Sequence, residues 1–342
     1  MARYVGLDLG TAYTRIWTLE NGIVLRSPTA AAMDSQTHQL VALGAEARRM
    51  LGKTPENILT FRPVRDGVVT DLEVTARMLD AFFANKKLRT TLRRPAVLLA
   101  TPYRITEVEQ LAVENAIMSA GARAVAQVPA IFAAATGANL RVTSPRGCMI
   151  LSVGGGITEA AVISAGGIIS ARSAKMAGER FDMAIINYLK HRRNLLIGDA
   201  TAEALKVRVG VADPTATPSL KEGEMEVCGR DSVTSLAARK VVSSQEIYEA
   251  LSPSLDAVAR IALSALENVP PEISGDVQTF GIMLCGGSAL LPGLAKAIAR
   301  RTGLRVTLAA DPLDCVIRGL GMIIRKPTIW GDELQDRIRS IL

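Results

Sequence analysis

Two stretches decide the fold of this chain: "LDLGTAYTRIWTL" at residues 7–19 and "LSVGGGITEAAVI" at residues 151–163. Each reads as a strand, a turn containing glycine and a second strand, which is the pattern of a β-hairpin. When the two are aligned without gaps, Gly10 falls on Gly154 and Asp8 falls on Ser152. The repeat predicts two related halves that each open with a hairpin, although glycine turns also resemble one another by chance.

Helical patterns follow each hairpin, as an α/β architecture requires. The periodicity predicts a helix within residues 69–87 and another within 106–122 that stops at Gly121. Their apolar stripes are Leu72, Met78, Leu79, Phe82 and Phe83 in the first, and Val108, Leu111 and Ala112 in the second. Residues 179–193, 201–210 and 243–270 are also helix-like, and the last opens with a serine cap followed by glutamate.

Length and composition limit the class of protein. At 342 residues the chain predicts about two domains, and 49% hydrophobic with 21% charged residues is typical of globular α/β proteins. No apolar run approaches the roughly 18 residues of a membrane span, and the start lacks a signal-peptide pattern, so a cytoplasmic chain is expected. The cysteines lie far apart and only two histidines are present, which argues against a zinc site or a disulfide framework.

The net charge of +7 and pI of about 9.4 favour anionic partners. In the basic stretch 85–94, Leu88 and Leu92 stand among lysines and arginines, so they could insert into a bilayer interface, or the stretch could be a solvated loop. The tail spaces Trp330, Leu334, Ile338 and Leu342 every four residues, a stripe that suits packing on the chain's own first domain or on a membrane. Nucleic-acid binding is not expected, because the basic residues lack interleaved aromatics.

The two turns predict a phosphate site. Each follows a strand and offers consecutive backbone N–H groups together with threonine hydroxyls. Asp8 would lie at the carboxyl end of the first strand, where a Mg²⁺ ion on the phosphates needs an oxygen ligand or an acceptor for its water. The residues concerned are Gly10, Thr11, Ala12, Tyr13 and Thr14 in the first turn and Gly154, Gly155, Gly156 and Thr158 in the second.

A third glycine cluster follows another apolar run. Small residues at Gly286, Gly287 and Ser288 would let a nucleotide base or an α-phosphate approach the backbone. Glu203 and Lys206 lie three apart on a predicted helix and could reach the ribose or base. Such a pair is more often an ordinary surface ion pair.

Taken in order, the motifs resemble the MreB-type bacterial actins, the filament-forming proteins of rod-shape determination. The resemblance runs from about residue 4 to about residue 325, and its specificity comes from the joint order of the motifs. The motifs are "GLDLGTAYT", "ALGAEARRMLGKTPENI", "RPVRDGVVTDLEVTARML", "GGGITEAAVIS", "GERFDMAIINY", "IGDATAEALK", "LCGGSALLPGL" and "DPLDCVIRGLG".

The resemblance implies an α/β fold of the actin/Hsp70/sugar-kinase type, with two related domains around a cleft that holds ATP or ADP and Mg²⁺. Domain I would comprise residues 1–144 and 311–342 with a small subdomain at about 33–74. Domain II would comprise 145–310 with a small subdomain at about 180–250. The resemblance further implies filaments on the inner face of the cell membrane that organise cell-wall synthesis, with the chain itself, an active MreB-type paralogue and the cell-wall elongation machinery as partners.

Carried over by position, Asp8 and both turns match the family's phosphate motifs. Gly178, Glu203 and Lys206 match its nucleotide-side positions, and Ser288 replaces the third glycine of its adenosine motif. The family usually reads Asp-Ile-Gly-Gly-Gly-Thr-Thr-Glu at the second turn, where this chain has Ser152 and Ile157.

Two more departures lie near the phosphates. In "AQVPAIFAAATGAN", residues 126–139, an ungapped register places Pro129 and Ala130 where the family has two glutamates. Tyr13 replaces the usual Asn of the first turn. The water-positioning carboxylate is thus expected to be missing, and losing such a group commonly costs several orders of magnitude in phosphoryl transfer.

We therefore expect a divergent filament protein that binds ATP and hydrolyses it slowly or not at all. The alternative is that Ser152 is compensated by Asp8 and water, which would leave ordinary ATPase activity. Two further classes stay open: a non-polymerising scaffold or regulator with the same fold, and a sugar or carboxylate kinase, for which no catalytic base stands out in the matching motifs.

Overall fold

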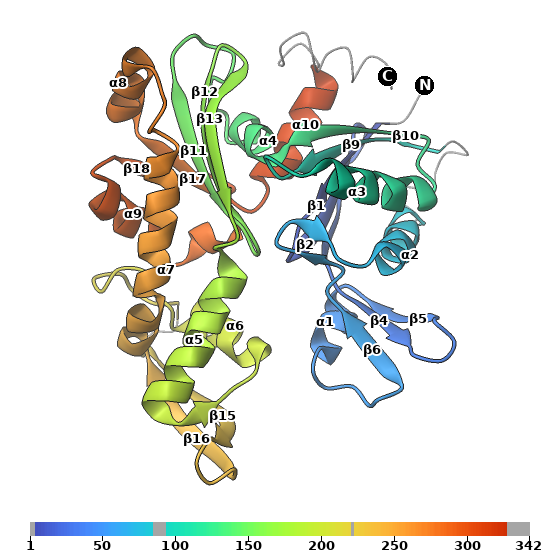
Figure 1. Cartoon of the computed structure of the whole chain (residues 1–342), viewed down its shortest axis with the longest axis vertical. Helices are drawn as coiled ribbons and strands as arrows, with labels where there is room; N and C mark the ends of the chain where they lie inside the picture. Colours follow the sequence, from blue (N-terminus) through green and yellow to red (C-terminus); the bar gives the residue numbers. More distant parts are fainter. Residues whose placement is uncertain (1–3, 85–93, 220–221, 327–342) are drawn as a thin grey trace.

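The computed structural model describes residues 4–84, 94–219 and 222–326, and two five-stranded sheets form its framework (Figure 1). The first sheet has the order β10-β9-β1-β2-β3. Its strands are β1 (Tyr4–Leu9), β2 (Tyr13–Thr18), β3 (Gly22–Pro28), β9 (Ala96–Thr101) and β10 (Ala124–Pro129). The second has the order β13-β12-β11-β17-β18. Its strands are β11 (Cys148–Val153), β12 (Thr158–Ser164), β13 (Gly167–Ala174), β17 (Ile282–Cys285) and β18 (Val306–Leu308).

The two sheets are connected in the same way. In each, the first strand pairs antiparallel with the second and the second with the third, while two later strands add in parallel on the other side. The predicted hairpins are therefore real, as β1–β2 and β11–β12. Their registers are equivalent too, because Asp8 lies opposite Arg15 and Ser152 lies opposite Glu159.

Helices cover the outer faces of both sheets (Figure 1). The first sheet carries α2 (Leu72–Phe83) and α3 (Glu107–Ser119); the second carries α7 (Ser244–Ser264), α8 (Pro271–Phe280) and α9 (Leu294–Thr302). The predicted serine cap of α7 is present as a reciprocal pair, in which Ser243 accepts from the Glu246 amide and Glu246 accepts from Ser243.

The predicted apolar stripe of α3 was wrong. Val108 and Leu111 are 77% and 58% exposed, whereas the buried face is formed by Val113, Ala116 and Ile117. Val113 and Ile117 belong to the core of the first sheet, together with Leu7 and Leu9 of β1. Similarly, Leu72 at the start of α2 is exposed, although Met78, Leu79 and Phe82 of the same stripe are buried.

Two smaller units extend in the same direction from the sheets and face each other (Figure 1). One contains β4 (Ala31–Asp34), β5 (Leu40–Leu43), β6 (Ile58–Phe61) and α1 (Ala45–Met50), and the hairpin β7 (Val64–Arg65)–β8 (Val68–Val69) follows it. The other contains α5 (Gly178–Arg193), β14 (Leu195–Leu196), α6 (Asp199–Arg208), β15 (Glu224–Asp231) and β16 (Ala237–Ser243).

Helices α4 (Ala130–Gly137) and α10 (Cys315–Arg325) cross between the two large sheets, and their core contains residues of both. Their backbones touch: a Cβ on Gly319 would lie 1.8 Å from the Ala133 carbonyl oxygen, and one on Gly137 would lie 1.9 Å from that of Cys315. Only glycine permits so close an approach. The crossing therefore joins the two halves through a shared core.

Within the three described segments, no helix has the length and hydropathy needed to cross a bilayer. The membrane candidates Leu88 and Leu92, and the stripe from Trp330 to Leu342, lie outside the described residues. The four cysteines are free thiols. The domain limits given above stay predictions.

Candidate functional site

A cavity of about 580 Å³ opens between the two halves, and both hairpin turns line it. Nearly all of the predicted site residues meet there, from six separate stretches of the chain. They are Asp8, Gly10, Thr11, Ala12, Tyr13, Ala130, Ser152, Gly154, Gly155, Gly156, Gly178, Glu203, Lys206, Gly286, Gly287 and Ser288. Thr14 and Thr158 do not line it.

The two turns are closed by the same hydrogen bond. The Gly10 amide donates to the Tyr13 carbonyl at 3.1 Å, and the Gly154 amide donates to the Ile157 carbonyl at 2.9 Å. A Cβ on Gly10 would lie 2.9 Å from that Tyr13 oxygen, which explains why the turn begins with glycine. The hairpin repeat in the sequence thus produces two equivalent turns on opposite walls of one cavity.

The hydroxyls of Thr14 and Thr158 brace these turns from behind, and both residues are fully buried. Thr29 donates to the Gly10 carbonyl at 2.7 Å, so the 2.9 Å contact between the Thr14 and Thr29 hydroxyls has Thr14 as donor. Thr158 donates to the Met176 carbonyl. The expectation that these hydroxyls face phosphate differs from their observed role, because the fold already uses them.

The third glycine cluster is tied directly to the second turn. Ser288 donates from Oγ to the Gly154 carbonyl at 2.8 Å, and the Gly178 amide at the start of α5 donates to the same oxygen at 3.2 Å. Lys206 donates to the Gly178 carbonyl at 2.9 Å and pairs with Asp182 at 2.7 Å. Serine in place of glycine at 288 therefore has a local reason, since its hydroxyl holds the turn.

Ion pairs connect the two smaller units across the mouth of the cavity. Arg48 on α1 pairs with Glu203 on α6 and also donates to the Tyr13 hydroxyl at 3.1 Å. Arg62 pairs with Glu179 on α5 at 2.9 Å. The sequence analysis missed both arginines, because nothing in their local sequence marks them as facing the other half of the chain.

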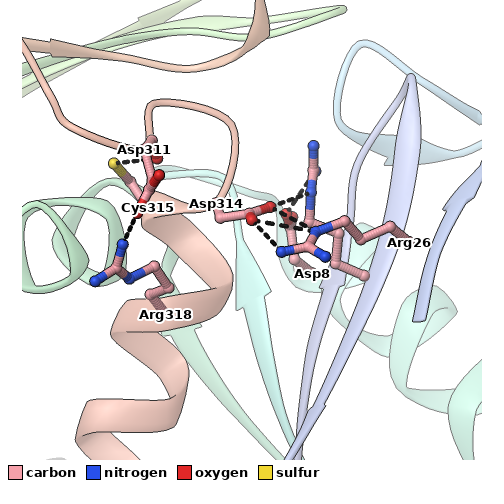
Figure 2. Close-up of polar contacts among 7 residues, drawn as sticks. Asp8, Arg26, Asp311, Asp314, Cys315 and Arg318 are labelled. Carbon is pink, nitrogen blue, oxygen red and sulfur yellow. Dashed lines mark hydrogen bonds and ion pairs between the residues drawn. The ribbon is translucent and has the colours of Figure 1, made fainter. Parts of the chain in front are cut away.

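Asp8 is paired with a cation. Arg15, directly opposite on β2, approaches the Asp8 carboxylate at 3.2 Å, and its Nε lies 3.2 Å from Asp314. Arg26 also contacts Asp314, beside Asp8 (Figure 2). Burial raises the pKa of Asp8, and the charge of Arg15 opposes this. The sequence analysis missed Arg15, although the hairpin register that it predicted places positions 8 and 15 opposite each other.

Glu159 is a buried carboxyl in the cavity wall, 3% exposed and directly across from Ser152. It accepts from the Tyr103 amide at 2.7 Å. Burial raises its pKa to about 7. Among the carboxylates that line the described cavity, Asp8, Glu179, Asp182 and Glu203 each have an arginine or lysine partner, and Glu159 has none.

Glu159 should make folding stability pH-dependent. Its folded pKa of about 7 exceeds the ordinary glutamate pKa of 4.5, so the folded state binds more protons between these values, and the free energy of unfolding falls as pH rises through that window. The Glu159→Gln variant should lose up to roughly 3 kcal/mol of that dependence between pH 5 and pH 8. Urea unfolding at both pH values checks this, with the exposed Glu107→Gln as control. If the unfolding free energy of Glu159→Gln changes between pH 5 and pH 8 as much as that of the unmodified chain, the prediction is contradicted.

Ala130, at one of the two positions where the resemblance leads us to expect a glutamate, begins α4 and follows Pro129. Its side chain is a methyl group, and it lines the cavity. Ser152, near the end of β11, lines the same cavity. Neither of these two wall positions therefore supplies a carboxylate.

Comparison with known proteins gives consistent matches along the chain. A family model described as MreB/Mbl protein matches residues 2–330. The cell shape-determining protein Mbl of Bacillus subtilis (strain 168) is 40% identical over 323 residues, covering 94% of this chain and 96% of that protein. The cell shape-determining protein MreB of Escherichia coli (strain K12) is 38% identical over 335 residues, covering 96% and 95%.

Solved structures agree. MreB 5 of Spiroplasma citri bound to AMPPNP superposes with a TM-score of 0.90 at 33% identity, covering 100% of this chain and 99% of that one. The same protein bound to ADP gives a TM-score of 0.89. A MamK double helical filament gives 0.79 at 17% identity, over 95% of this chain and 99% of that one, and this likeness concerns the fold. The expected actin-like fold is confirmed.

Proposed function

This chain belongs to the MreB/Mbl family, and from that premise we propose that it is a cytoskeletal protein of cell-shape determination that binds ATP or ADP in the central cavity. One observation carries the proposal most: two equivalent glycine turns from distant parts of the sequence converge on one cavity. Backbone amides in such turns suit phosphate oxygens. The nucleotides bound to the Spiroplasma relative support the same assignment.

We propose that hydrolysis of the bound ATP is slow. Phosphoryl transfer depends on a positioned water and on groups that stabilise the charge developing in the transition state. Ala130 and Ser152 leave the cavity wall without carboxylates at two positions where the family resemblance expects them. Nucleotide binding, by contrast, relies on turns that are intact.

One observation favours a fully active ATPase instead. Glu159 lacks a cationic partner among the described residues, and its pKa of about 7 would let it accept a proton near neutral pH. It lies in the same wall as Ser152. If hydrolysis is fast, Glu159 is the residue that we expect to support it.

Magnesium stays a prediction, and the side chains do not fit it well. The carboxylate proposed to hold the ion or its water, Asp8, is already paired with Arg15. At the equivalent position of the second hairpin, Ser152 offers a neutral hydroxyl. In the part of the chain that the structure describes, no cluster of three or more His, Cys, Asp or Glu residues could hold a metal.

Self-association into membrane-associated filaments is also part of the proposal, and so is a role with the cell-wall elongation machinery. The family membership supports the filament. The net charge of +7 supports attraction to an anionic membrane surface, with Leu88 and Leu92 as the candidate insertion residues. An active family paralogue is a proposed co-assembly partner.

Sedimentation of the purified chain with ATP, with ADP and without nucleotide tests this function. A filament protein should pellet above a critical concentration, and electron microscopy of the pellet should reveal filaments. Protein that binds nucleotide and stays in the supernatant at every concentration, with or without anionic vesicles, would favour the non-polymerising scaffold.

A further inference from the structure

The cation beside Asp8 belongs to the protein itself. We propose that the Arg15 guanidinium acts in place of a divalent cation at the phosphate site, so that nucleotide binding to this chain does not depend on Mg²⁺. The inference rests on the proposed nucleotide-binding function and concerns the same cavity.

Arg15 is positioned for this role by the hairpin. It lies directly opposite Asp8 in the β1–β2 register, and it lines the cavity together with the first turn. Its side chain is 12% exposed. An arginine at this position is therefore inside the site and not on the outer surface.

The guanidinium is held on several sides. NH1 contacts Asp8 and Nε lies beside Asp314, both at 3.2 Å, while the group lies 5.5 Å from the centre of the Tyr13 ring. Among the described residues, NH1 donates to Asp8, whereas Nε lies near Asp314 as an ion pair and is a buried N–H group without a hydrogen-bond partner. A planar guanidinium with fixed orientation suits phosphate oxygens, because it presents parallel N–H donors.

The same arrangement disfavours a metal ion. A divalent cation at Asp8 would share its carboxylate with a guanidinium that already contacts it at 3.2 Å, and the two positive charges would repel each other. A positive charge already lies beside the Asp8 and Asp314 carboxylates, because Arg15 pairs with both. The bound phosphates would then meet a positive group without any metal.

The Tyr13 side chain is explained by the same arrangement. Its ring lies beside the guanidinium groups of both Arg15 and Arg48, each 5.5 Å from the ring centre. Aromatic faces attract cations at this distance. Tyr13, which departs from the family's Asn, therefore helps to hold two arginines at the phosphate end of the cavity.

Titration of a fluorescent ATP analogue, in Mg²⁺ and in EDTA, tests the proposal. The dissociation constant of the unmodified chain should agree within about threefold between the two conditions. Arg15→Leu should weaken binding in EDTA by about tenfold or more, and Mg²⁺ should restore part of the loss. Arg15→Lys keeps the positive charge, so its dissociation constant in EDTA should lie between those of the unmodified chain and Arg15→Leu.

Arg26→Leu is the matched control. It removes an arginine from the same Asp314, but Arg26 is 55% exposed and does not line the cavity, so binding in EDTA should be unchanged. The double variant Asp8→Asn with Arg15→Leu leaves no unpaired buried carboxylate at position 8, so it replaces Arg15→Leu if that single variant folds poorly. Its binding in EDTA should also be about tenfold weaker than that of the unmodified chain.

Three results would overturn the proposal. Binding by the unmodified chain that weakens tenfold or more in EDTA means that the metal is required, while nucleotide binding itself stands. If Arg15→Leu or the double variant binds in EDTA as tightly as the unmodified chain does, Arg15 does not contact the phosphates. Absence of binding in both conditions instead rejects the nucleotide-binding function, and this inference with it.

Discussion

Ala130→Glu combined with Ser152→Asp is expected to raise the rate of ATP hydrolysis by about a hundredfold or more over the unmodified chain. Both positions line the cavity, from the start of α4 and from the end of β11. A glutamate in the first turn of a helix is also compatible with the helix dipole. The two carboxylates would orient the attacking water. The glycine turns position the phosphates but do not orient this water.

The gain should be measured as phosphate release in a single turnover, so that slow product release does not hide the chemical step. Each single variant is expected to give a smaller gain than the pair, because both groups act on one reaction. Ser219→Asp is the control, since it adds a negative charge at an exposed position lining the cavity. Equal rates in the double variant and in Ser219→Asp would mean that these positions do not limit hydrolysis.

Gly319→Ala is expected to destabilise the protein by more than about 3 kcal/mol, which is a large part of the stability of an ordinary domain. The added Cβ would lie 1.8 Å from the Ala133 carbonyl oxygen, and backbone cannot move away as a flexible side chain can. The helices α4 and α10 would have to separate, and they hold residues of both large sheets in one core.

The urea concentration at the unfolding midpoint measures this effect. Arg318→Ala, at the neighbouring position on α10, removes only an exposed ion pair with Asp311 and should cost well under about 1 kcal/mol. A Gly319→Ala variant as stable as Arg318→Ala would show that the two helices can separate freely. The closeness of their backbones would then not be what joins the halves.

Much of the fold could be predicted because its signals are local. The hairpins at Gly10 and Gly154 follow from strand–glycine–strand patterns, and the cap of α7 follows from Ser243 and Glu246 three residues apart. The face of α3 was wrong because the periodicity of Val108, Leu111 and Ala112 was interpreted as the buried stripe, whereas Val108 and Leu111 are exposed. Periodicity alone does not reveal which of two apolar faces has a sheet beneath it.

The site could be predicted where it is made of turns and not where it is made of long-range pairs. Glycines 10, 154 and 286 reach one cavity because each follows a strand of a sheet that faces the other half. Arg48 and Arg62 meet carboxylates more than a hundred residues away in sequence, and no local pattern encodes such a contact. The contact between Arg15 and Asp8 follows from the hairpin register, which places the two residues opposite each other, and it could have been predicted from the sequence.

Nucleotide binding and hydrolysis depend on different residues of this cavity. Binding is assigned to the backbone turns braced by Thr14, Thr158 and Ser288, all of which are intact. Slow hydrolysis is assigned to Ala130 and Ser152. A nucleotide held by intact turns but facing a wall without these two carboxylates should persist as the triphosphate.

The most direct measurement is therefore the chemical identity of the nucleotide that remains bound after prolonged incubation of the purified protein with ATP and Mg²⁺. Acid quenching followed by chromatography of the released nucleotide distinguishes ATP from ADP. The account predicts that ATP is retained, at close to one per chain. Conversion to ADP at the rate of an active actin-like ATPase would contradict it, and would make Glu159 the carboxylate to remove next.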